Sequence, residues 1–174
     1  MRTTADAPMP PDEALKLLKE GNARFIKGEP TATRTNEKMR QELVDMGQAP
    51  HTAIIGCADS RAPLETIFDA LPGDIFVLRN AGNTCTHAEG SMVGSLEFCL
   101  GALKTKMVLV LGHTACGAIK GATSTYLQSK TGNAPQVGDT QSMFEAVDFT
   151  DMMSIMWGGV YNLFIYSVGS CQIW

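Results

Sequence analysis

Two short motifs contain residue types that bind metal ions. They are Cys57-Ala58-Asp59-Ser60-Arg61 and Gly112-His113-Thr114-Ala115-Cys116-Gly117. Two thiolates and an imidazole suit Zn²⁺, which binds sulfur at about 2.3 Å and imidazole nitrogen at about 2.0–2.1 Å. Three firm ligands, Cys57, His113 and Cys116, would leave a fourth position for water or substrate, which is typical of a catalytic zinc site. Asp59 is a weaker, displaceable candidate for that position.

Each motif taken alone has a simpler interpretation. A single cysteine at the end of a strand usually packs as a small core residue, and an Asp-x-Arg pair is more often a surface ion pair. The placement of both motifs favours a metal site, because each follows an apolar run typical of a buried strand. These runs are residues 52–56 and 107–111, and a third run covers 75–78. Parallel strands gather their sites at their carboxyl ends.

The segments before and between these apolar runs are predicted to form helices. Pro10-Pro11-Asp12-Glu13 is typical of a helix start, and Gly28 and Pro30 are expected to end that helix. A second short helix is expected between Thr31 and Pro50. Further helices are expected to begin at Pro63, at a capping box over Thr86–Glu89 and at Thr114, where the threonine would be the cap. The predicted fold is therefore α/β: a central, mostly parallel sheet of about four strands with flanking helices and an N-terminal helical arm.

Length and composition narrow the class of protein. The 174 residues fit a single domain, with residues 1–50 as the helical arm and 51–174 as the zinc-binding α/β catalytic core. A net charge of −4 argues against a nucleic-acid partner. Five widely spaced cysteines argue against a disulfide framework and favour a reducing compartment, the cytoplasm or an organelle stroma. The uncharged run Met152–Trp174 is long enough to span a bilayer, but its glycines and amides disfavour a membrane tail.

The two motifs together resemble the signature pair of the β-carbonic anhydrases. Further stretches resemble the same family in the same order; they are Asn22-Ala23-Arg24-Phe25, Pro72-Gly73-Asp74, Arg79-Asn80-Ala81-Gly82-Asn83 and Ser95-Leu96-Glu97-Phe98. The resemblance covers about Ala14 to Ala122. After Ala122 the chain departs from the family pattern, because fewer residues precede the expected closing strand.

The resemblance implies a lyase that hydrates CO2 reversibly to bicarbonate and a proton by a zinc-bound hydroxide, with one zinc per chain. It implies that Cys57, His113 and Cys116 hold the zinc. It also implies that Arg61 holds Asp59 off the metal, so that Asp59 orients the hydroxide. Family members are homodimers or higher assemblies of dimers, and the same is expected here.

Two alternatives remain open at this point. One keeps the fold and the metal but changes the substrate to CS2 or COS. The other is a protein that binds zinc or bicarbonate without catalysis. For the C-terminal part, we expect residues Val160 to Ser167 to form an edge strand beside the third strand, with Trp157 and Trp174 covering apolar surface.

Overall fold

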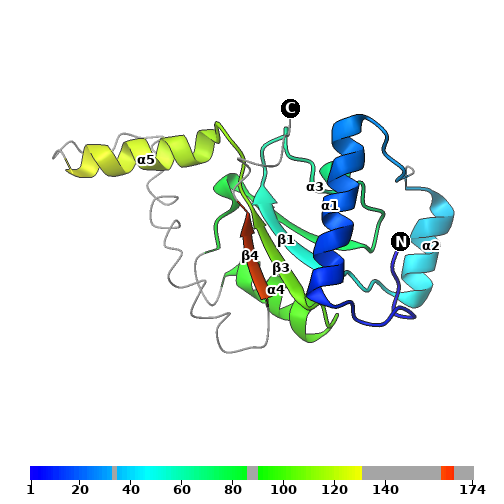
Figure 1. The fold of residues 1–174 in the computed structure, drawn as a ribbon. Coiled ribbons are helices and arrows are strands. Elements are labelled where there is room, and N and C mark those ends of the chain that lie inside the picture. Colours follow the sequence, from blue (N-terminus) through cyan, green and yellow to red (C-terminus); the bar gives the residue numbers. More distant parts are fainter. Residues whose placement is uncertain (33–34, 86–89, 131–161, 167–174) are drawn as a thin grey trace.

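The computed structural model describes residues 1–32, 35–85, 90–130 and 162–166, with only the backbone path given for 126–130 and 162–166. Four parallel strands form one sheet, with helices packed on both of its faces (Figure 1). The strands are β1 (Thr52–Cys57), β2 (Ile75–Asn80), β3 (Met107–Leu111) and β4 (Asn162–Tyr166). The α/β class and the strand number agree with the prediction from the sequence.

The N-terminal arm contains two helices, α1 (Pro11–Lys27) and α2 (Glu37–Met46). Proline at the start and glycine at the end delimit α1, because Gly28 adopts a left-handed φ of 72° that closes the helix. At Gly21, α1 comes so close to the chain after α3 that a Cβ would lie 1.9 Å from the carbonyl oxygen of Phe68. Any larger residue at position 21 would push the arm away from the sheet.

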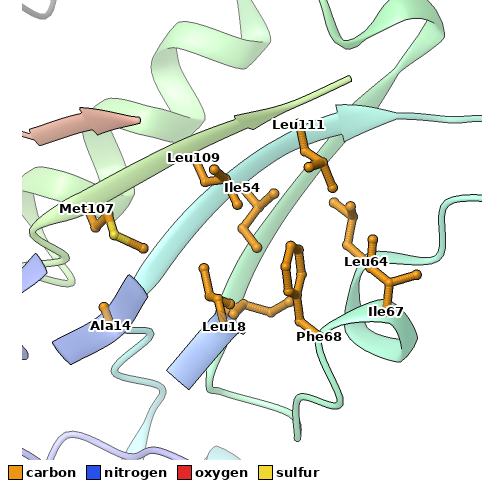
Figure 2. Packing of buried hydrophobic residues seen from close by; sticks show 10 residues of the cluster. Ala14, Leu18, Ile54, Leu64, Ile67, Phe68, Met107, Leu109 and Leu111 are labelled. Atoms are coloured by element: carbon orange, nitrogen blue, oxygen red, sulfur yellow. The ribbon is translucent and has the colours of Figure 1, made fainter. Parts of the chain in front are cut away.

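The sheet is buried because its strands alternate between two apolar clusters. On one face, α1 and the short helix α3 (Leu64–Ile67) pack against Ile54, Leu109 and Leu111 (Figure 2). On the other face, α4 (Ser91–Gly101) packs Val93, Leu96 and Cys99 against the alternate residues of β1 and β3. Both faces are covered, as expected for the central strands β1 and β3, which are buried along their whole length.

The strand order is β2-β1-β3-β4. The chain therefore moves from β1 to one side to form β2, and then crosses to the other side of β1 to form β3. This reversal lies between β1 and β3, which pair in parallel from Ala53 with Val108 to Gly56 with Leu111. Open α/β sheets bind ligands at such a switch point, outside the carboxyl ends of the strands. The motifs at Cys57 and His113 both follow these two ends.

Two helix starts differ from the prediction. The predicted capping box at Thr86–Glu89 lies outside the described residues, and α4 begins at Ser91 after Gly90, without a side-chain cap. Helix α5 (Gly117–Lys130) does not begin at a Thr114 cap. Ala115 has a left-handed φ of 53°, which interrupts a right-handed helix there. His113 and Cys116 therefore lie in a turn before α5.

The C-terminal edge strand is confirmed for the part of the chain that the structure describes. β4 pairs with β3 in parallel, from Met107 with Asn162 to Leu111 with Tyr166. Trp157, Trp174 and most of the run Met152–Trp174 lie outside the described residues. None of the helices described has both the length and the apolar character needed to cross a bilayer.

His51, which precedes β1, is expected to make folding sensitive to pH. Its ring is buried beside the Thr52 hydroxyl, with Nδ1 and Oγ1 2.8 Å apart. Burial lowers the His51 pKa from 6.5 to about 4, and the nearby Asp74 charge only partly opposes this. The unfolded chain therefore binds a proton more readily than the folded chain. Stability is fully present above about pH 6.5 and falls as the pH drops towards 4, by up to about 3 kcal/mol.

Urea unfolding of the metal-free protein at a series of pH values measures this effect. The His51→Asn variant stays neutral throughout, so its free energy of unfolding should fall less steeply between pH 6.5 and 4. Parallel curves for the two proteins would show that His51 does not cause the loss.

Candidate metal site

Three side chains that could bind a metal converge at the switch point. One ligand atom from each of Cys57, His113 and Cys116 lies within 4.8 Å of the other two. Cys57 is the last residue of β1, and His113 comes two residues after the end of β3. The parallel pairing of these strands brings the motifs to the same edge of the sheet. The structure thus places together the three residues that the sequence suggested as ligands.

His113 has one ring nitrogen engaged and the other free to bind. Its Nδ1 lies 3.0 Å from the carbonyl oxygen of Thr114. A carbonyl can only accept, so Nδ1 carries a proton, and in the neutral imidazole Nε2 then presents its lone pair. Nε2 is buried and has no hydrogen-bond partner among the described residues. A buried polar atom without a partner is costly, and a metal ion at this position would satisfy it.

Cys57 is held in a setting that favours the thiolate. The backbone N–H groups of Asp59 and Gly82 each donate to its Sγ, at 3.4 Å in both cases. Burial acts to raise the pKa of Cys57, but these two hydrogen bonds, with smaller effects from His113 and Cys116, bring the pKa below the ordinary value. The thiolate is the form that binds metals.

The spacing of the two sulfurs fits zinc. The Sγ atoms of Cys57 and Cys116 are 3.8 Å apart. Two thiolates at about 2.3 Å from one tetrahedral zinc ion would be separated by about 3.8 Å. Two sulfur ligands and one imidazole also leave one position open, as in catalytic zinc sites. The donor set, the sulfur separation and the unpartnered Nε2 of His113 all agree with this metal.

Asp59 and Arg61 form a forked ion pair next to the three ligands. Arg61 donates from Nε to Oδ1 at 2.9 Å and from Nη2 to Oδ2 at 2.8 Å, and its backbone N–H also donates to Oδ1 at 2.9 Å. These hydrogen bonds hold the pKa of Asp59 well below its usual range, so the carboxylate stays ionised near neutral pH. Its Oδ2 lies 3.9 Å from Nε2 of His113.

Arg61 also links the two motifs. Its Nη2 donates to the carbonyl oxygen of Ala115 at 3.1 Å. Ala115 lies between His113 and Cys116, and its left-handed φ forms the turn that brings these two side chains together. The contact between Arg61 and the second motif is not visible in the sequence, because it depends on a backbone carbonyl.

One residue beside the site, Arg79, was missed by the sequence analysis. Arg79 donates to the carbonyl oxygens of Cys57 and Asp59. The available signal was a charged residue directly after the apolar run of β2, residues 75–78. Cys85 and Cys99 are buried and pack as small apolar residues of the core.

Comparisons with known proteins agree with the fold and the motifs. Residues 52–149 match a family model described as carbonic anhydrase. Carbonic anhydrase 2 of Mycobacterium tuberculosis strain H37Rv is 43% identical over 112 residues, which are 64% of this chain and 52% of that protein. A carbonic anhydrase of Mycolicibacterium smegmatis is 40% identical over 114 residues, covering 66% of this chain and 53% of that protein.

The chain thus spans about half the length of the curated relatives that it matches. Among solved structures, the β-carbonic anhydrase CcaA has the same fold, with a TM-score of 0.53 and 24% identity over 91% of this chain and 92% of that chain. The family model matches more than half of the 174 residues and contains both motifs. The chain therefore belongs to the carbonic anhydrase family, in its β class.

Proposed function

We propose that this chain catalyses the reversible hydration of CO2 to bicarbonate and a proton, with Cys57, His113 and Cys116 holding one zinc ion. The observation that carries the proposal is the buried Nε2 of His113, which has no hydrogen-bond partner in the described residues and lies within 4.8 Å of both sulfurs. Family membership supports the same reaction.

Zinc, when bound, is a Lewis acid that can lower the pKa of a water molecule from 15.7 to about 7. Asp59 lies beside the ligand cluster as an ionised carboxylate, so it can accept a hydrogen bond from the attacking oxygen and orient it towards CO2. Arg61 donates to both carboxylate oxygens and would thereby restrain Asp59 from coordinating the metal. Asp59 and Arg61 would thus orient the attacking oxygen, while the three other residues hold the metal.

The cysteines and the exposed apolar side chains bear on the compartment and the assembly that we propose for the protein. The four cysteines in the described residues are all free, which supports a compartment where thiols stay reduced. Several large apolar side chains are exposed in the single chain, including Val44 and Phe98. Exposed apolar surface of this kind favours association, so we propose assembly as a homodimer or as a larger assembly of dimers.

A stopped-flow CO2 hydration assay on the zinc-loaded protein and its Asp59→Asn variant tests the proposed reaction. The variant should keep one zinc per chain, because Asp59 is not one of the three firm ligands. Its kcat should fall on the order of 10²–10³-fold, because the neutral amide has one acceptor oxygen and lacks the negative charge of the carboxylate.

The matched control is Asp45→Asn, which changes an exposed carboxylate on α2 whose Oδ1 accepts a hydrogen bond from Gln41. This variant should retain the activity of the parent chain. Zinc-loaded wild-type protein without CO2 hydration would reject the proposed reaction and favour a zinc-binding or bicarbonate-binding role. Full activity in zinc-replete Asp59→Asn would remove Asp59 from the mechanism.

A further inference from the structure

The segment Cys57–Asp59 leaves the sheet while carrying two groups that the site needs. Cys57 is the last residue of β1 and pairs in register with Asn80, the last residue of β2. One backbone hydrogen bond continues the connection, from the N–H of Ala58 to the carbonyl oxygen of Asn80 at 2.8 Å. Beyond this point the strand ladder ends, so the carbonyls of the departing segment need other donors. The backbone N–H of Ala62 donates to the carbonyl oxygen of Asp59 at 3.0 Å.

Arg79 adds side-chain donors to the same segment from the neighbouring strand. Its Nε donates to the carbonyl oxygen of Cys57 at 2.9 Å, and its Nη2 donates to that of Asp59 at 2.7 Å. The two accepting residues flank Ala58. One planar guanidinium therefore holds both sides of the turn, which a side chain with a single donor cannot reproduce.

We propose that Arg79 is a positioning residue of the metal centre, fastening the Cys57–Asp59 segment to β2 and so fixing the thiolate and the carboxylate together. The two arginines act on Asp59 in different ways. Arg61 holds the carboxylate of Asp59, whereas Arg79 holds its backbone carbonyl. The inference rests on the proposed zinc site but not on the proposed CO2 chemistry.

The effect of Arg79 on the metal should come from preorganisation. The backbone N–H of Asp59 donates to the sulfur of Cys57, so a shift of the Asp59 backbone also changes the environment of the thiolate. Partners of this kind, which orient the ligands of a metal without touching it, change metal affinity by about 10–100-fold when removed. Arg79 is exposed, which places the expected effect near the lower end of that range.

The test is competition for Zn²⁺ between the purified protein and a chromophoric chelator. Arg79→Met keeps the length of the side chain without its donors, and it should weaken zinc binding about tenfold. Arg79→Lys retains one charged donor and should recover part of that affinity. Arg40→Met, which changes an exposed arginine on α2, is the matched control and should bind zinc like the parent chain.

Two further measurements distinguish an effect of Arg79 on the position of the metal ligands from a general loss of protein stability. The Co²⁺-substituted Arg79→Met protein should show altered d–d absorption, because the ligand geometry changes. Thermal melting of the metal-free proteins reports any loss of stability that does not involve the metal. If Arg79→Met does not fold, Arg79→Lys takes its place, with a smaller loss of affinity expected.

Zinc affinity within twofold of the parent chain, with an unchanged cobalt spectrum, would overturn the role of Arg79 even if the melting temperature falls. A parent chain that binds no zinc would instead reject the proposed function. The two failures are therefore distinguishable.

Discussion

Replacing Cys57 by alanine is expected to weaken zinc binding on the order of 10²–10³-fold and to lower CO2 hydration with it. Cys57 is the ligand candidate with the largest number of supporting contacts, because two backbone N–H groups donate to its sulfur. Protein zinc sites bind with about 10–16 kcal/mol in total, so the loss of one ligand should weaken binding on the order of 10²–10³-fold. Equilibrium dialysis followed by elemental analysis measures the change.

Cys99→Ala is the matched control for this experiment. Cys99 is a fully buried thiol in α4, where its Sγ lies 3.2 Å from the hydroxyl of Thr105, on the sheet face opposite α1. Its loss should lower stability but leave zinc affinity unchanged. Equal zinc affinity in Cys57→Ala and Cys99→Ala would show that Cys57 is not a ligand.

Replacing Arg61 by alanine is expected to lower CO2 hydration at least 100-fold while zinc remains bound. The side chain of Arg61 makes two hydrogen bonds to the Asp59 carboxylate and a third to the carbonyl of Ala115. Without them, Asp59 is free to turn towards the ligand cluster and to compete for the open coordination position. The Arg61→Ala protein should therefore lose CO2 hydration activity and still contain as much zinc as the parent chain.

The double variant Arg61→Ala/Asp59→Asn shows whether Arg61 acts through Asp59. If it does, the double variant should be no less active than Asp59→Asn alone, because the two changes remove one function. Arg61→Lys should be intermediate, since an ammonium group keeps the charge but not the fork. Additive losses in the double variant would contradict this relation between the two residues.

Much of the fold could be predicted because β1 and β3 are almost entirely apolar and end where the apolar pattern stops. The sequence placed β3 at 107–111, and the structure has the same bounds. The two motifs were expected at one edge of the sheet because both follow strands, and the parallel pairing of β1 with β3 places them there. Helix α1 was predictable from its proline start and glycine end.

The features that could not be predicted depend on contacts between distant segments. The left-handed Ala115 delays α5, although alanine is a strong helix former. The hydrogen bonds from Arg79 to the backbone of the first motif join residues about twenty positions apart. Backbone donors and acceptors leave no trace in the side-chain pattern, so sequence spacing does not reveal them.

The central claim is that Cys57, His113 and Cys116 bind one zinc ion. Elemental analysis combined with zinc X-ray absorption spectroscopy of the purified full chain tests it most directly. We expect one zinc per chain, with two sulfur ligands at about 2.3 Å and one imidazole nitrogen at about 2.0–2.1 Å. A zinc-free protein after incubation with excess metal, or a shell of four sulfurs, would contradict the claim.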